Sequence, residues 1–192
     1  AAVEAVDEAI RTAARAGARL QVSHITPRGG RADTERAIEH VDAARADGQD
    51  VAFDMHTRLF GTTYLKVILP PWALDGGVDA IARRLGDADE RAKMKSYRSL
   101  ISALGDWDRV VLLDNPALPE CSRRSIGEIA RERGQDPFDA ACAMLLTEVE
   151  QIHRPMVILH SYSEDLLSLT YQHPICTVGS DATALAPDGP LA

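Results

Sequence analysis

The chain has 192 residues, of which 45% are hydrophobic, so it is long enough for one domain with a sizeable core. Its net charge of -8 argues against a nucleic-acid-binding surface, and no apolar run approaches the ~20 residues of a membrane span. No signal-peptide pattern stands at the start, and Cys121, Cys142 and Cys176 lack CxxC spacing, which is typical of reduced thiols. We therefore expect a cytoplasmic protein with no nucleic-acid or membrane partner.

The first third of the chain alternates helices and strands, as judged from the spacing of apolar residues. Asp33 or Thr34 is expected to cap the second helix. Strand, helix and strand with short connections form a βαβ unit, so the two strands are expected to be parallel neighbours. The predicted elements are a helix at 2–16 that stops at Gly17, a strand at 19–24, a loop at 27–30, a helix at 33–47 that ends before Gly48, and a strand at 50–56.

After this βαβ unit the pattern changes. Glycines and prolines are mixed with apolar residues over 59–76, and we expect 59–106 to be an insertion that lies over the mouth of a barrel. Helix caps are expected at Ser122 or Ser125, at Asp136 and at Ser163. The predicted elements are two helices within 78–103 broken near Gly86, a strand at 109–114, helices at 122–133 and 137–150, a strand at 156–160, a helix at 163–171, a strand at 175–180 and an irregular tail at 182–192.

Strands that end in His or Asp, with helices between them, are how an α/β barrel gathers side chains at one mouth. The chain has about five predicted strands, whereas a complete barrel of this type needs eight. It also opens directly in a helical pattern, without an initiator Met. We therefore expect an α/β fold in which residues 1–192 are the C-terminal part of a metal-dependent (β/α)8 TIM-like barrel with the first strands missing, as a piece of a longer protein.

Three predicted strands are followed by residues of the kind that bind metals: His24, His56 and Asp181. Two imidazoles on adjacent parallel strand ends, about 4.8 Å apart, can converge on one ion. Imidazole and carboxylate hold a catalytic zinc while leaving a position open for water. The residues alone leave alternatives open, because His24 could be a hydrogen-bonded core histidine and Asp181 a helix cap. Asp54 could be a ligand or a partner that orients an imidazole.

Two further residues could take part in chemistry. His160 ends a predicted strand and could donate a hydrogen bond to a developing oxyanion, or it could be structural. Arg58 stands close to a predicted ligand and is suited to a two-pronged contact with a substrate carboxylate, or it could be an ordinary surface arginine. Structural roles are favoured for His40, His153 and His173 because of their places in a helix, a polar turn and a strand start.

Several segments, taken in their order, resemble the D-aminoacylase group, the N-acyl-D-amino-acid deacylases of the amidohydrolase superfamily. The resemblance runs from about residue 20 to 182. The segments are Val22-Ser23-His24; Ala43-Ala44-Arg45-Ala46-Asp47-Gly48 leading to Val51 and Asp54; Leu69-Pro70-Pro71-Trp72-Ala73 with Gly76-Gly77; Ser125-Ile126-Gly127-Glu128-Ile129-Ala130 with Asp136-Pro137; and His173-Pro174 leading to Gly179-Ser180-Asp181.

This resemblance implies a metal-dependent barrel that holds one or two zinc ions. His24 would match the metal histidine of the family's fifth strand, His56 that of the sixth, and Asp181 the catalytic aspartate of the eighth. Arg58 would stand where members of the family place a basic residue for the substrate carboxylate. The family's His-x-His pair has no counterpart anywhere in this chain, and His56-Thr57-Arg58 stands where many members have Tyr-Pro-Tyr.

The implied activity is zinc-dependent hydrolysis of the amide bond of N-acyl (D-)amino acids by the intact protein. Asp181 would take a proton from a water molecule activated by zinc and pass it to the leaving amine, and His160 would help to stabilise the oxyanion. The expected partner is a small-molecule N-acyl amino acid, and homo-oligomerisation stays open. The alternatives are a cyclic-amide hydrolase of hydantoinase or dihydroorotase type, or a non-catalytic fragment or binding module.

Overall fold

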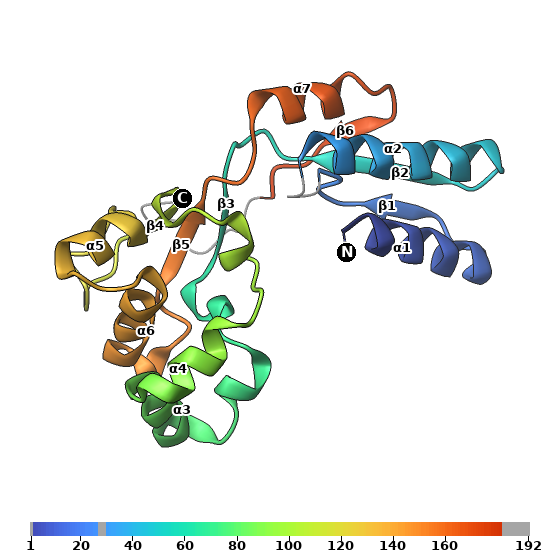
Figure 1. Cartoon of the computed structure of the whole chain (residues 1–192). Helices are drawn as coiled ribbons and strands as arrows, with labels where there is room; N and C mark the ends of the chain where they lie inside the picture. Colours follow the sequence, from blue (N-terminus) through green and yellow to red (C-terminus); the bar gives the residue numbers. More distant parts are fainter. Residues whose placement is uncertain (1, 27–29, 182–192) are drawn as a thin grey trace. The chain divides into compact units, whose positions relative to one another are not determined.

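The computed structural model of the chain describes residues 2–26 and 30–181 (Figure 1). The predicted tail at 182–192 and most of the predicted loop at 27–30 lie outside these residues. No helix within the described part of the chain is both long enough and apolar enough to cross a membrane.

The chain forms two compact units, each with its own hydrophobic core. The first unit consists of residues 1–59 and 162–192, and the second is the intervening segment 60–161. The second unit starts where the sequence predicts an insertion, but it extends well past the predicted end of that insertion at 106. The expectation that the insertion covers a barrel mouth stays a prediction.

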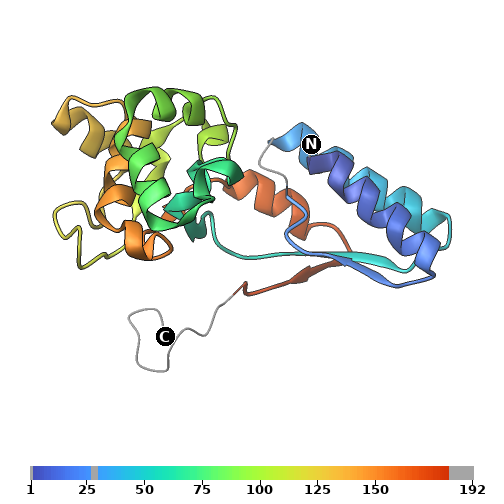
Figure 2. The same ribbon diagram turned by 90° about the horizontal axis from the view of Figure 1, so that it is seen from below.

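The first unit is a three-stranded parallel sheet in the order β1-β2-β6, with its helices on one face (Figures 1 and 2). The parallel pairing of β1 with β2 confirms the predicted βαβ unit. Its elements are α1 (Ala2–Ala16), β1 (Leu20–Val22), α2 (Arg31–Ala46), β2 (Val51–Met55), α7 (Glu164–Tyr171) and β6 (Cys176–Val178).

Side chains alternate between the two faces of this sheet, as the period of a strand requires. Phe53 of the central strand is fully buried and belongs to the core that includes Ile10 of α1 and Val41 of α2. On the other face, Gln21 of β1 donates through Nε2 to Oδ2 of Asp54 on β2, at 3.1 Å. One face of the sheet is therefore apolar and packs against the helices, and the other carries polar side chains.

Helix α2 begins earlier than the sequence predicts, at Arg31, and its N-cap is Gly30. The φ of Gly30 is 93°, a conformation that glycine adopts without strain. The expected caps, Asp33 and Thr34, lie in the first turn instead, where the Thr34 hydroxyl donates to the Gly30 carbonyl at 3.0 Å. The prediction of an Asp33 or Thr34 cap is therefore wrong, because the helix begins before either residue is reached.

The second unit contains an antiparallel sheet in the order β3-β5-β4. The predicted strands at 109–114 and 156–160 form here, but they pair antiparallel and are not strands of a parallel barrel sheet. A short apolar run encodes burial and not the direction of its partner. The elements are β3 (Gly61–Tyr64), α3 (Gly77–Gly86), α4 (Ala88–Lys95), β4 (Val110–Leu112), α5 (Ile126–Arg133), α6 (Pro137–Thr147), β5 (Met156–Leu159) and the short 3-10 helices Leu65–Ile68, Pro71–Leu74, Ser102–Leu104, Trp107–Arg109 and Val149–Gln151.

The helix caps predicted for the later helices are confirmed. The Ser125 side chain accepts the N–H of Glu128 at the start of α5, at 3.0 Å. Asp136 accepts the N–H of Phe138 at the start of α6, also at 3.0 Å, and Ser163 caps α7. These side chains satisfy backbone donors that a helix start leaves unpaired.

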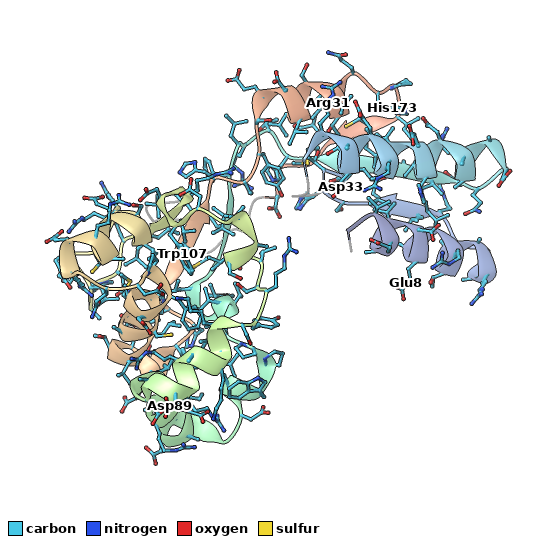
Figure 3. The ribbon with its side chains drawn as sticks, in the orientation of Figure 1. Glu8, Arg31, Asp33, Asp89, Trp107 and His173 are labelled. Carbon is cyan, nitrogen blue, oxygen red and sulfur yellow. The ribbon has the colours of Figure 1, made fainter. Side chains whose placement is uncertain are left out.

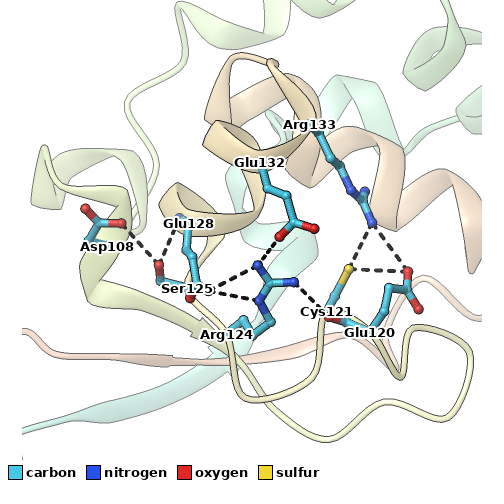
Figure 4. Close-up of polar contacts among 8 residues, drawn as sticks. All are labelled: Asp108, Glu120, Cys121, Arg124, Ser125, Glu128, Glu132 and Arg133. Atoms are coloured by element: carbon cyan, nitrogen blue, oxygen red, sulfur yellow. Dashed lines mark hydrogen bonds and ion pairs between the residues drawn. The ribbon is translucent and has the colours of Figure 1, made fainter.

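All three cysteines are free thiols, and Cys121 and Cys142 are buried. Burial raises the pKa of Cys142 to about 12, so this thiol stays protonated and unreactive at neutral pH. Burial also raises the pKa of Cys121, whose sulfur accepts a hydrogen bond from the Arg133 guanidinium at 3.0 Å (Figure 4). Both thiols pack as small apolar groups in the hydrophobic core of the second unit.

The carboxylate of Asp108 is held at the start of α5. It accepts one hydrogen bond from the Ser125 hydroxyl at 3.1 Å, which is drawn in Figure 4. It also accepts two from the Arg131 guanidinium at 2.9 Å each, and this pairing lowers the pKa of Asp108. A Cβ at Gly127 would lie 2.3 Å from Oδ1 of Asp108. The close approach of Asp108 thus explains why a glycine stands at position 127.

Replacing Gly127 with Ala should destabilise the second unit by roughly 1–3 kcal/mol, the usual cost of overpacking. The added methyl group must push the Asp108 carboxylate away from its partners. Chemical denaturation measures the effect, and G86A is the matched control because a Cβ at Gly86, at the end of α3, meets nothing within 4 Å. Equal stabilities of G127A and G86A would contradict this explanation.

Candidate functional site

The predicted metal-binding residues lie at one edge of the parallel sheet. Parallel strands point the same way, so their C-terminal ends meet at the same edge. His24 follows β1 by two residues, His56 follows β2 directly, and Asp181 follows β6 by three residues. The topology therefore brings these three segments together, although they are far apart in the sequence.

The side chains at this edge are close to one another. The rings of His24 and His56 lie edge to face, with centroids 5.1 Å apart and planes at 75°. Nε2 of His24 is 3.7 Å from Oδ1 of Asp181, and Nη2 of Arg58 is 3.4 Å from Oδ2 of the same carboxylate. Two imidazoles, one carboxylate and one guanidinium thus form a single cluster.

His56 is the buried member of the cluster, with 1% of its surface exposed. The ring of Tyr162 lies edge-on to it, with centroids 4.9 Å apart. Burial lowers the pKa of His56, and the nearby charges of His24 and Arg58 lower it further against the opposing effect of Asp181. Since protonation is disfavoured, this ring is a neutral imidazole at physiological pH, the form that can bind a metal.

His24 sits in a left-handed backbone conformation, with φ of 56°. Its backbone N–H donates to Oδ1 of Asp54 at 3.1 Å. The open question about Asp54 thus has a structural answer, because its carboxylate holds the backbone of His24 rather than an imidazole. The His24 ring itself is half-buried and faces His56 and Asp181.

Asp181 is exposed and stands at the end of the described residues. Arg58 also donates to the backbone carbonyl oxygens of Ser180, at 3.2 Å, and Asp181, at 3.1 Å. Strand β6 is hydrogen-bonded directly to β2, with Phe53 paired to Cys176, so the segments that carry His56 and Asp181 lie side by side.

His160 belongs to the second unit, so the cluster in the first unit does not include it. Its backbone N–H donates to the carbonyl of Arg109 at 3.0 Å, and its own carbonyl accepts the Arg109 guanidinium at 2.6 Å. Its ring is 6.1 Å from that of Phe60. The ending of β5 resembles that of β1 in sequence, but the two strands lie in different sheets. The oxyanion role of His160 stays a prediction.

Two other histidines pair with carboxylates at helix surfaces. His173 lies in the turn between α7 and β6 (Figure 3). Its Nε2 is 3.2 Å from Oδ2 of Asp42 on α2. His40 of α2 has Nδ1 3.5 Å from Oδ1 of Asp7 on α1. Both contacts join elements of the first unit, in keeping with the structural roles favoured from the sequence.

The donor types in the cluster fit zinc, which binds imidazole and carboxylate. Within residues 2–26 and 30–181, however, no group of three His, Cys, Asp or Glu side chains is arranged to hold a metal ion. Nδ1 of His56 also accepts the N–H of Arg58 at 3.2 Å, which leaves the proton of the neutral ring on Nε2. A metal at Nε2 would require this contact to change. The residues fit zinc by their chemistry, as part of a site.

Sequence reasoning missed the supporting residues of this cluster. Tyr162 is more than 100 positions from His56 in the sequence, and no local pattern links them. Ser23 and Gln21 both donate to Asp54, at 3.0 and 3.1 Å. The only available signal was their spacing before His24, with Gln21 in β1 and Ser23 just after it, since i and i+2 share a face of an extended segment.

Comparison with solved structures shows that the fold of this chain is similar to part of the fold of D-aminoacylase and of an N-acyl-D-glutamate deacylase. It matches N-acyl-D-glutamate deacylase from Bordetella bronchiseptica, solved with zinc and a phosphonate mimic of the tetrahedral intermediate, at 23% identity and a TM-score of 0.59. It matches structures of D-aminoacylase at 20% identity with TM-scores of 0.57 and 0.59, one of them a study of a binuclear metal centre. The sequence-based resemblance to this group is thus confirmed at the level of structure.

Each of these matches covers 93% of this chain and 29% of the solved protein. The chain therefore spans less than a third of the length of the enzymes it resembles. No protein-family model matches the sequence, and no curated protein matches it significantly. The α/β class is confirmed, while the described residues contain two three-stranded sheets and no closed barrel. The partial barrel stays a prediction.

The buried state of His56 predicts a specific loss of stability in acid. Its pKa in the folded protein is below the ordinary value of 6.5, so the unfolded chain binds the proton first as the pH falls. The stability that neutral His56 contributes is present above pH 6.5 and is lost as the pH drops toward the lower native pKa. Denaturation at several pH values should show a steeper loss in the wild type than in H56Q. The exposed His153 provides the control, H153Q, which should follow the wild type.

Proposed function

We propose that the protein containing this chain is a metal-dependent hydrolase that cleaves the amide bond of N-acyl (D-)amino acids. The observation that carries the proposal is the cluster of two imidazoles, one carboxylate and one guanidinium at the C-terminal edge of a parallel sheet. Support comes from the structural likeness to N-acyl-D-glutamate deacylase and D-aminoacylase. An edge of this kind is where α/β enzymes gather their catalytic side chains.

His24, His56 and Asp181 would hold zinc, one ion or two, together with ligands beyond these three. When bound, such a metal acts as a Lewis acid that activates water and polarises the substrate carbonyl. His56 suits this task because its lowered pKa keeps it neutral. The likeness to a deacylase solved with zinc supports the choice of metal.

Asp181 would act as the general base and then as the general acid. Its carboxylate can take a proton from the attacking water and return it to the leaving amine. It is half exposed, within reach of substrate, and its Oδ2 is 3.4 Å from Nη2 of Arg58. The cation keeps one oxygen oriented and leaves the other toward His24, at 3.7 Å.

Arg58 would bind the carboxylate of the substrate. A guanidinium has five donors in a planar fork, so it can serve Asp181 and a second carboxylate at the same time. This arrangement would place the scissile amide next to the two imidazoles, because the amide of an N-acyl amino acid lies one carbon from its carboxylate.

Zinc binding should depend on both imidazoles. In the protein that contains this chain, H24A and H56A should each weaken zinc binding by at least about tenfold, since losing even an outer partner of a ligand costs about 10–100-fold. Isothermal titration calorimetry with zinc chloride measures the affinity. H40A removes a histidine that pairs with Asp7 on the helix surface and should bind zinc as the wild type does. Unchanged affinity in H24A and H56A would remove the metal site from the proposal.

Hydrolysis should depend on Asp181. D181N keeps the shape of the side chain but cannot take a proton, so kcat on N-acetyl-D-amino acids should fall about 10²–10⁴-fold. D165N, an exposed change in the first turn of α7, is the matched control. Substrates amidated at the carboxyl group should show a raised KM if Arg58 binds that carboxylate.

Other results of the same assay would point elsewhere. Turnover of hydantoins or dihydroorotate, with none of N-acyl amino acids, would identify a cyclic-amide hydrolase. A protein that binds zinc but hydrolyses neither class would fit a non-catalytic binding role. Wild-type kcat in D181N would contradict the role of Asp181 outright.

A further inference from the structure

We propose that Asp54 is a positioning residue that sets the geometry of the candidate site from the centre of the sheet. It would act through the backbone of His24 on one side and through the segment before Asp181 on the other. The functional consequence rests on the proposed metal site, whereas the structural claim can be tested without it.

The carboxylate of Asp54 collects three hydrogen bonds from the end of β1. Oδ1 accepts the backbone N–H of His24 at 3.1 Å. Oδ2 accepts the Ser23 hydroxyl at 3.0 Å and the side-chain amide of Gln21 at 3.1 Å. The backbone carbonyl of Asp54 also accepts the N–H of Ile25 at 3.1 Å. Asp54 thus accepts hydrogen bonds from four residues of β1 and the turn after it.

This turn needs to be held. The φ of His24 is 56°, in the left-handed region that residues with a Cβ avoid. Such a conformation persists only where surrounding contacts impose it. The bond from the His24 N–H to Oδ1 of Asp54 is the contact made by the strained residue itself. Without it, the turn can relax to an ordinary conformation and carry the imidazole away from His56.

The same carboxylate lies against the end of β6. A Cβ at Gly179 would be 3.2 Å from Oδ1 of Asp54, a tighter contact than most Cβ atoms make, so any other residue there would press on this carboxylate. The N–H of Gly179 donates to the carbonyl of Met55 at 3.1 Å, which continues the pairing of β6 with β2. Asp181 follows two residues later. Asp54 therefore fixes the spacing of both flanking segments.

These contacts argue for positioning rather than direct metal binding by Asp54. Both oxygens already accept hydrogen bonds, and every donor comes from β1 or the turn after it. Outer residues that orient ligands in this way are worth about 10–100-fold in metal affinity. Their removal should disturb the site without removing a ligand.

Amide hydrogen exchange of the protein that contains this chain provides the test. In D54A the amide of His24 should exchange at least about tenfold faster than in the wild type. D54N should show an intermediate rate, because its amide oxygen can still accept one N–H. The matched control is D50N at the opposite end of β2, where Asp50 pairs with Arg19; the His24 amide there should keep its wild-type rate.

Cobalt binding, read from its visible absorption, supplies a second measurement. D54A and D54N should bind cobalt at least about tenfold more weakly than D50N. If D54A does not fold, D54N carries the test alone. Wild-type exchange at His24 in a folded Asp54 variant would overturn the proposal. A wild type that binds no metal, with fast exchange in D54N, would instead contradict the proposed function and leave the positioning role supported.

Discussion

The parallel pairing of β1, β2 and β6 is the constraint on which the rest of the first unit depends. It places the ends of three distant segments at one edge and fixes their spacing through the hydrogen-bond ladder. Two residues at the end of the central strand contribute to the site in different ways. His56 is buried, and Asp54 contacts both flanking segments. The candidate site is therefore a property of the whole sheet rather than of a single loop.

The second unit interrupts the chain of the first unit between β2 and α7. Its first and last strands, β3 and β5, pair antiparallel from Gly61 with Leu159 onward, so the chain enters and leaves as neighbouring strands. Just before and after this ladder, the carbonyl of Leu59 accepts the N–H of Tyr162 at 3.1 Å. The second unit also has a hydrophobic core of its own. The pairing of β2 with β6 is made entirely within the first unit.

Much of this arrangement follows from the sequence, and the failures have physical causes. Apolar periodicity predicts α1 and the parallel pair β1-β2, and residue type predicts which strand ends meet. The direction of β4 and β5 could not be predicted, because a short apolar run indicates burial and carries no information about the direction of its partner. The expected caps of α2 failed because the helix begins at Arg31, after Gly30, which places Asp33 and Thr34 inside its first turn. Contacts such as Tyr162 with His56 depend on tertiary structure alone.

Burial and the charged groups of the cluster affect the pKa of His56 to different degrees. Burial is the main reason why His56 is neutral, and the cation of Arg58 adds to it, while the carboxylate of Asp181 opposes it. In the proposed function, a substrate carboxylate bound to Arg58 would offset part of that cation's charge at the moment when His56 must remain unprotonated. Burial does not depend on that cation, so it keeps the pKa of His56 low even where the charge of Arg58 is offset. The edge-on ring of Tyr162 packs against His56 and contributes to this burial.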